Sequence, residues 1–395
     1  MISNYVKESL EKSSGIRAMF EEGNALRAKY GAENVYDFSL GNPDPPPPDE
    51  VHNTLLSLVS QNSAGLHSYM NNAGFGDVRE KVADYINKTQ GTELALDNIV
   101  MTCGAGGGLN VALKALLNPG EEVIVFAPYF VEYGFYIENH GGTMVLLPTD
   151  ARTFLPDVAA LESGITKNTK AVILNSPNNP SGAVYGESVL KSIADVIKQK
   201  QREFGTEIYV LSDEPYRDIV YDGVTVPSVL RIFKNSLVVY SFSKSLSLPG
   251  ERIGYIAANS TIDDIKLLMN ALIFANRSLG YVNAPSLFQK VVAESLDVTV
   301  YVNIYKERRD VLYGHLTSLG FECIKPQGAF YLFPKCPMPD TNAFKQLALE
   351  QRIILVPGAG FGCPDHFRLA YCVGLDTIKN SLPAFTELAR RAGLV

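Results

Sequence analysis

Short apolar runs alternate with amphipathic stretches over residues 49–285 of this chain. The apolar runs are rich in β-branched residues and predict seven strands, at 99–101, 123–126, 143–147, 171–174, 208–211, 237–240 and 254–257. Helical periods lie between many of them, for example at 106–117 and 187–204. Strands that are apolar on both faces are typical of parallel sheets covered by helices. The pattern therefore predicts an α/β fold with a mostly parallel seven-stranded sheet between helices.

The pattern changes after about residue 285. Helical stretches and short apolar runs follow, at 301–319, 328–333, 342–351 and 366–372. A final helix is expected after Asp376, which we interpret as its N-cap. This mixture predicts a smaller α+β domain at 286–395.

A proline-rich stretch, NPDPPPP at 42–48, separates the N-terminal segment from the sheet region. Proline fixes φ and lacks a backbone donor, so we expect an extended connector there. A helix is predicted before it, at 16–30. We therefore divide the chain into an N-terminal segment, 1–48, that packs with the small domain, a large domain, 49–285, and the small C-terminal domain, 286–395.

Composition excludes several classes of protein. Among 395 residues, 35 Lys and Arg stand against 42 Asp and Glu, a net charge of −7, so bulk charge does not favour nucleic acid or an anionic membrane. The five cysteines form no CxxC pair, and the five histidines are scattered, so neither a disulfide framework nor a zinc site is expected. A polar N-terminus without a signal-peptide core, and the lack of any 18-residue apolar run, predict a cytoplasmic protein that does not enter the membrane.

A lysine follows directly after the predicted strand 237–240, in the segment SFSKSLSLPGERIGY at 241–255. Ligands of α/β folds bind at the carboxyl edge of the sheet, which is where Lys244 is expected. A lysine near cations and shielded from water can act as a nucleophile on a carbonyl, and the serines and Arg252 suit a phosphate. A solvated lysine at a strand end is the equally common alternative. The string SFSK also matches the S-x-x-K motif of penicillin-recognising enzymes, but their S-D-N and K-T-G motifs are missing.

An acid ends another predicted strand, in the segment YVLSDEPY at 209–216. Asp213 precedes Lys244 by 31 residues, about one strand–helix–strand step, so adjacent parallel strands would bring both to one edge. A buried carboxylate there needs a cationic partner, such as a protonated ring nitrogen. Tyr216 could then hydrogen-bond a phenolic oxygen. A helix N-cap is the alternative role for Asp213.

Two further loops are expected at the same edge. Asn175, Asn178 and Asn179 follow a strand in the turn NSPNNPSG at 175–182. The glycine-rich segment CGAGGGL at 103–109 precedes a helix, where backbone N–H groups can bind an anion. A dinucleotide fingerprint would require an acid at the end of the next strand, and the run VIVFAPYF at 123–130 ends without one.

Together these segments resemble the fold-type I pyridoxal-phosphate enzymes of the class I/II aminotransferase family, which includes aspartate aminotransferase. NPSG, SDEPY and SxSK followed by PGxRxGY occur in the family's order and spacing, and the resemblance runs from SLGNP at 39–43 to FRL at 367–369. It implies a pyridoxal 5'-phosphate enzyme that moves an amino group between an L-amino acid and a 2-oxo acid. It also implies a homodimer with shared active sites.

The resemblance assigns roles to matched positions. Lys244 would form a Schiff base with the cofactor and move the substrate's α-proton, while Asp213 would keep the pyridinium nitrogen protonated. The other expected cofactor contacts are Tyr216 and Asn179 to the ring hydroxyl oxygen, Ser241, Ser243, Arg252 and the Ala105–Gly106 backbone to the phosphate, Phe130 stacked on the ring, and Tyr69 to the phosphate of the neighbouring subunit. The expected substrate contacts are Arg368, which would bind the α-carboxylate, with Gly41 and Asn179 beside it. No metal is implied.

Some positions depart from the family, and other functions remain open. Gly106 stands where some bacterial aspartate-type members carry a lysine for the second substrate carboxylate, and Arg277 is a possible replacement. A neutral or aromatic amino acid, or a broad range, therefore fits at least as well as a dicarboxylate. A β-C–S lyase of the same fold and cofactor, similar to cystathionine β-lyase, is the alternative enzyme. A non-catalytic effector-binding module is disfavoured, because no DNA-binding region precedes residue 40 and the site residues are present.

Overall fold

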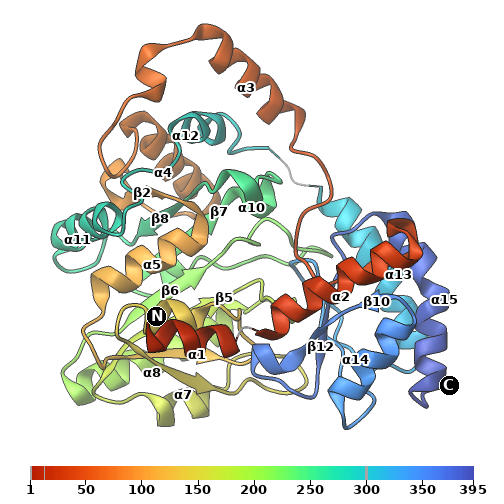
Figure 1. Cartoon of the computed structure of the whole chain (residues 1–395). Helices are drawn as coiled ribbons and strands as arrows, with labels where there is room; N and C mark the ends of the chain where they lie inside the picture. The colour runs from red at the N-terminus through yellow and green to blue at the C-terminus, as the bar shows by residue number, and fades with distance from the viewer. Residues whose placement is uncertain (1, 13, 299–300) are drawn as a thin grey trace. The chain divides into compact units, whose positions relative to one another are not determined.

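The computed structural model describes residues 2–12, 14–298 and 301–395, without the side chains of residues 11–20 (Figure 1). The chain divides into two compact units. The large unit comprises Pro45–Val302 and Gln327–Ala329, and the small unit comprises Met1–Asp44, Asn303–Pro326 and Phe330–Val395. Residues 41–48 contain neither helix nor strand, which confirms the connector expected from the prolines.

A seven-stranded sheet forms the centre of the large unit, in the order β2-β8-β7-β6-β5-β3-β4. Its strands are β2 (Ile99–Thr102), β3 (Glu122–Phe126), β4 (Thr143–Leu147), β5 (Thr169–Asn175), β6 (Tyr209–Asp213), β7 (Ser236–Ser241) and β8 (Gly254–Ala258). Strand β8 is antiparallel to both of its neighbours, and the other neighbouring strands pair in parallel. The mostly parallel seven-stranded sheet predicted from the apolar runs is therefore confirmed.

Ten α-helices belong to the described residues of the large unit. They are α3 (Asp49–Gln61), α4 (Gly76–Gln90), α5 (Gly104–Leu116), α6 (Tyr133–Glu138), α7 (Val158–Gly164), α8 (Glu187–Phe204), α9 (Val229–Ile232), α10 (Phe242–Ser245), α11 (Ile265–Ser278) and α12 (Ser286–Ala293). Helices α5 and α11 share one buried apolar cluster with the strands, whereas α7 and α8 pack on each other (Figure 1). Helix α5 approaches the sheet closely at Gly108, where a Cβ atom would lie 2.6 Å from Cγ1 of Val239.

The small unit contains two short sheets and five α-helices within its described residues. Strands β1 (Tyr36–Asp37) and β10 (Ile353–Ile354) pair in parallel, while β11 (Val356–Pro357), β12 (Phe367–Ala370) and β9 (Tyr331–Leu332) form an antiparallel sheet. The helices are α1 (Asn4–Lys12), α2 (Ser14–Tyr30), α13 (Val302–Ser318), whose first residue belongs to the large unit, α14 (Thr341–Glu350) and α15 (Leu375–Arg391). The smaller α+β part of the predicted fold is confirmed.

The start of the last helix corrects one expectation. Gly374, and not Asp376, is the N-cap of α15, and Asp376 lies inside the first turn. The helix begins at Leu375, one residue before Asp376, so the aspartate that could have accepted the capping hydrogen bond already lies within the helix. An acidic side chain in the first turn still interacts favourably with the helix dipole.

None of the helices within the described residues combines the length and the apolar character needed to span a bilayer.

Candidate functional site

Three parallel strands of the large unit end at one edge of the sheet. Asn175 at the end of β5 lies opposite Asp213 at the end of β6, and Asp213 lies opposite Val239 in β7. Strand β7 continues for two residues to Ser241 and leads directly into α10, which contains Lys244. The prediction that adjacent parallel strands bring Asp213 and Lys244 to one edge is confirmed.

The asparagine turn is fixed to this edge by hydrogen bonds. The Asn175 amide Nδ2 donates to the Asp213 carbonyl oxygen at 2.9 Å, and its Oδ1 accepts from the Asn179 backbone N–H at 2.8 Å. The turn contains two cis peptide bonds, Ser176–Pro177 and Asn179–Pro180. Asn179 is buried, so the turn holds this residue in a defined place next to the end of β6.

The carboxyl group of Asp213 is buried and only partly satisfied. The Tyr133 hydroxyl, at the start of α6, donates to Oδ2 of Asp213 at 2.5 Å. The other oxygen, Oδ1, has no hydrogen-bond partner among the described residues. Burial raises the pKa of Asp213 to about 7, the Tyr133 hydrogen bond acts to lower it, and the neighbouring Glu214 raises it. A cation placed against Oδ1 would therefore be strongly favoured.

Two further predicted residues follow the strands that end at this edge. Tyr216 is buried in the turn that follows β6, so Asp213 is not the N-cap of a helix. Lys244 is half-buried in the single turn of α10. Ser241 caps this turn, since its Oγ accepts from the Ser243 backbone N–H at 3.2 Å.

The glycine-rich loop opens the first turn of α5. Gly104 has a φ of +70°, a left-handed conformation that glycine adopts without strain. Gly254, the first residue of β8, packs directly against this loop. A Cβ atom on Gly254 would lie 2.2 Å from the Tyr240 carbonyl oxygen and 3.1 Å from the Gly104 Cα. The backbone of Ala105 and Gly106 follows in the first turn of the helix.

Hydroxyl and guanidinium groups lie around that turn. The Oγ atoms of Ser241 and Ser243 are 2.7 Å apart. Nη2 of Arg252 lies 3.0 Å from where a Cβ of Gly104 would be. Arg252 is itself held in a left-handed conformation, φ 52°, and its Nη1 donates to the Pro249 carbonyl oxygen at 3.0 Å. Backbone N–H groups at a helix start, hydroxyls and an arginine form a donor set suited to a phosphate.

The aromatic residues expected from the sequence have different surroundings. Phe130 packs edge-to-face on Tyr133, with ring centroids 5.6 Å apart, and so lies beside the Asp213 end of the site. Tyr69 is 93% exposed in the single chain. Arg277 is exposed on α11, and its guanidinium lies over the Phe274 ring at 5.5 Å.

Arg368 and Gly41 belong to the small unit, where both lie against Tyr331. The guanidinium of Arg368 lies over the Tyr331 ring at 4.8 Å and over the Phe361 ring at 4.9 Å, and its Nη2 donates to the Ser39 carbonyl oxygen at 2.6 Å. A Cβ atom on Gly41 would lie 2.0 Å from the Tyr331 hydroxyl oxygen, so only glycine fits there. The two predicted substrate residues are thus joined through one tyrosine.

Two residues of α6 were missed by the sequence reasoning. Tyr133 bonds Asp213, and Tyr136 places its hydroxyl oxygen 3.0 Å from where a Cβ of Gly106 would be. The signal that could have found them is the run of aromatic residues at 129–136, immediately after a predicted strand.

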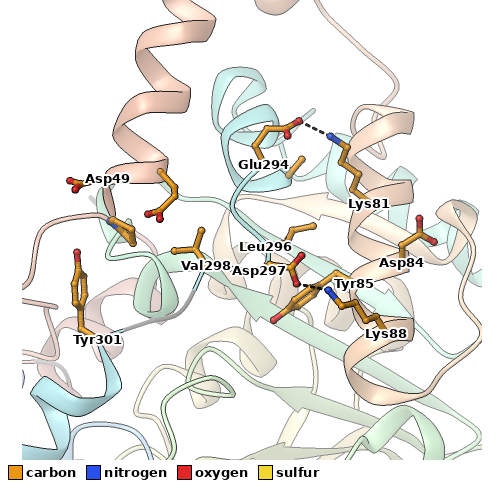
Figure 2. Close-up of a pocket in the computed structure, with 13 residues that line it drawn as sticks. Asp49, Lys81, Asp84, Tyr85, Lys88, Glu294, Leu296, Asp297, Val298 and Tyr301 are labelled. Carbon is orange, nitrogen blue, oxygen red and sulfur yellow. Dashed lines mark hydrogen bonds and ion pairs between the residues drawn. The ribbon is translucent and has the colours of Figure 1, made fainter.

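A hollow elsewhere in the large unit contains none of these residues (Figure 2). It has a volume of about 830 Å³ and lies between α4 and the segment after α12. Lys81 pairs with Glu294 at 2.6 Å, and Lys88 pairs with Asp297 at 3.0 Å. These exposed pairs account for both lysines of the hollow, and pairs of this kind contribute little to stability.

Similarity to known proteins identifies the family of this chain. The model of the class I and II aminotransferases matches residues 32–383. An aminotransferase structure from Eubacterium rectale is 44% identical, with a TM-score of 0.96 and coverage of 100% of both chains. The aspartate aminotransferase structure from Thermotoga maritima is 29% identical, with a TM-score of 0.86, 98% of this chain covered and 99% of that chain.

A curated relative agrees with these structures. The aspartate aminotransferase of Pyrococcus horikoshii is 31% identical over 360 residues, which are 89% of this chain and 88% of the relative. The chain described here belongs to the class I and II aminotransferase family and is an aminotransferase.

Proposed function

We propose that this aminotransferase binds pyridoxal 5'-phosphate, the cofactor typical of its family, at the sheet edge of the large unit. The observation that carries the proposal is the buried Asp213 carboxyl group, whose Oδ1 has no hydrogen-bond partner among the described residues and whose pKa is raised to about 7. The protonated ring nitrogen of the cofactor supplies the missing positive charge and the missing donor. The donor set at the start of α5 fits the phosphate of the same molecule.

Each large-unit residue then has one task. Arg252, Ser241, Ser243 and the backbone at Ala105–Gly106 bind the phosphate. Asp213 binds the ring nitrogen, while Tyr216 and Asn179 hydrogen-bond the ring hydroxyl oxygen and Phe130 stacks on the ring. When bound, the cofactor supplies an electron sink for bonds at the substrate's α-carbon.

Lys244 carries the proton in this proposal. Its amine would hold the cofactor at the aldehyde carbon, and once the substrate's amino group had displaced it, the freed amine could accept the proton from the substrate α-carbon and pass a proton on to the cofactor. Its place in α10, directly after β7, fixes the backbone from which this side chain reaches the site. A base held by a short, capped turn is pre-positioned for the transfer.

Arg368 provides the substrate carboxylate site. Two aromatic rings restrict the motion of its guanidinium. A bidentate pair with the α-carboxylate of an amino acid or 2-oxo acid therefore costs little additional side-chain conformational entropy. Gly41, which lies against the same Tyr331, flanks that carboxylate. We further propose a homodimer in which Tyr69, exposed in the single chain, binds the phosphate of the neighbouring subunit.

The visible absorption spectrum of the purified protein tests this proposal. Added pyridoxal phosphate should give a visible band, and single L-amino acids without an oxo acid should bleach it. Lys244→Ala should remove the band change and lower kcat at least about 1,000-fold, because both the attachment point and the base are lost. Lys234→Ala, which removes an exposed lysine paired with Asp263, is the matched control. Normal turnover of Lys244→Ala would refute the assignment.

A further inference from the structure

Gly106 adds no side-chain hydrogen-bond donor to the residues expected to bind the phosphate, and the Tyr136 hydroxyl lies where such a side chain would be. Glycine contributes no side chain at this position in the first turn of α5. The structure places the Tyr136 hydroxyl oxygen 3.0 Å from where the Cβ of residue 106 would be, and Nη2 of Arg252 4.0 Å from the same point. The phenol oxygen therefore occupies the space in which a serine or threonine side chain at position 106 would lie.

Helix α6 explains why this tyrosine reaches the loop. Tyr133 and Tyr136 are three residues apart, so they project from the same side of this short helix. Tyr133 contacts Asp213, and Tyr136 contacts the first turn of α5, against which α6 packs. One helix turn thus delivers a phenol to each end of the site.

The Tyr136 hydroxyl is available as a donor. It forms no hydrogen bond to the residues that the structure describes. Burial raises the pKa of Tyr136, nearby Glu132, Asp213 and Tyr281 add to this, and Arg252 acts against it. The hydroxyl therefore keeps its proton at neutral pH.

We propose that the Tyr136 hydroxyl donates a hydrogen bond to the cofactor phosphate beside Arg252, in place of the side chain that Gly106 lacks. This inference rests on the proposed function, because the phosphate it binds is that of the proposed cofactor. It assigns the residue to phosphate binding and gives it no part in proton transfer.

Binding of pyridoxal phosphate and of pyridoxal, which lacks the phosphate, tests the inference without turnover. In Tyr136→Phe, the Kd of pyridoxal phosphate should rise roughly ten- to hundredfold, the range for a lost hydrogen bond to a charged group. The Kd of pyridoxal should change less than about twofold. The ³¹P resonance of the bound phosphate should shift relative to the wild type. Tyr209→Phe, at the opposite end of β6, is the control.

A second variant tests whether the phenol substitutes for a side chain at position 106. In Gly106→Ser/Tyr136→Phe, the contact at 3.0 Å is gone and the serine hydroxyl can reach the phosphate, so affinity should recover. Gly106→Ser alone should weaken binding, since its Cβ meets the phenol oxygen. Equal losses for both ligands in Tyr136→Phe, or unchanged affinity for both, would overturn the inference. Failure of the wild type to bind pyridoxal phosphate would instead refute the proposed function.

Discussion

Asp213→Asn should change how the stability of the cofactor-free protein depends on pH. The variant keeps the size of the side chain and its hydrogen bond from Tyr133, but it removes the titrating carboxyl group. Burial raises the pKa of Asp213 from 3.8 to about 7. A carboxyl group whose pKa is higher in the folded state holds its proton more tightly there, so the free energy of unfolding falls as the pH rises between the two values.

The size of the effect follows from the pKa difference. A difference of about 3 pKa units corresponds to about 4 kcal/mol at 1.36 kcal/mol per unit, lost between about pH 4 and about pH 7. Measured from about pH 5 to about pH 8, the loss is about 3 kcal/mol. The amide of the variant leaves one buried N–H₂ group unsatisfied, which costs about 1–3 kcal/mol at every pH. The change of slope therefore separates the effect of the charge from the cost of the unsatisfied amide.

Urea unfolding of the cofactor-free proteins at these two pH values measures the effect. The wild type should lose about 3 kcal/mol more than Asp213→Asn between about pH 5 and about pH 8. Asp195→Asn, which changes an exposed acid on α8, should follow the wild type. Bound pyridoxal phosphate should remove the wild-type slope, because a cationic ring nitrogen stabilises the carboxylate. Parallel pH profiles of wild type and Asp213→Asn would refute the reasoning.

Two further substitutions test other parts of the fold and site. Arg368→Ala should raise KM for the amino acid about 100-fold with a smaller change in kcat, because a bidentate pair with the substrate carboxylate is lost. Steady-state kinetics measure both constants, and an unchanged KM would mean that another group binds the carboxylate. Gly254→Ala should lower the free energy of unfolding by about 2–3 kcal/mol, since its Cβ would meet the Tyr240 carbonyl oxygen and the Gly104 Cα. Gly250→Ala, whose Cβ would have nothing within 4 Å, is the control, and an equal loss in urea unfolding would contradict the packing argument.

The sheet could be predicted from the sequence because its signal is local. Each of the seven strands contains a continuous apolar run, and such runs can be recognised without knowledge of the neighbouring strands. The positions of Asp213 and Lys244 at one edge followed from a spacing that suits one strand–helix–strand step. The reversed direction of β8 could not be read in this way, because a strand buried on both faces has the same pattern in either direction.

The phenols of α6 were harder to predict. This helix has six residues, too few to show a helical period, and its role depends on contacts with residues far along the chain. Tyr133 is 80 residues from Asp213, and nothing in the intervening sequence records that contact. The N-cap of α15 was predicted wrongly for the opposite reason. The preference of aspartate for N-cap positions favoured Asp376, but the helix begins at Leu375.

The direction of β8 has a consequence for where the chain runs between Lys244 and Arg252. Because β8 is antiparallel to β7, it begins at the edge where β7 ends. The short connection from Ser241 to Gly254 therefore stays at that edge, and it carries Lys244 near its start and Arg252 near its finish. A parallel strand in the same place would begin about 17 Å away, at the opposite edge, and its connection would have to run back across the sheet. One strand reversal thus lets a single loop hold both the amine and the guanidinium, so an insertion there should disturb both groups together.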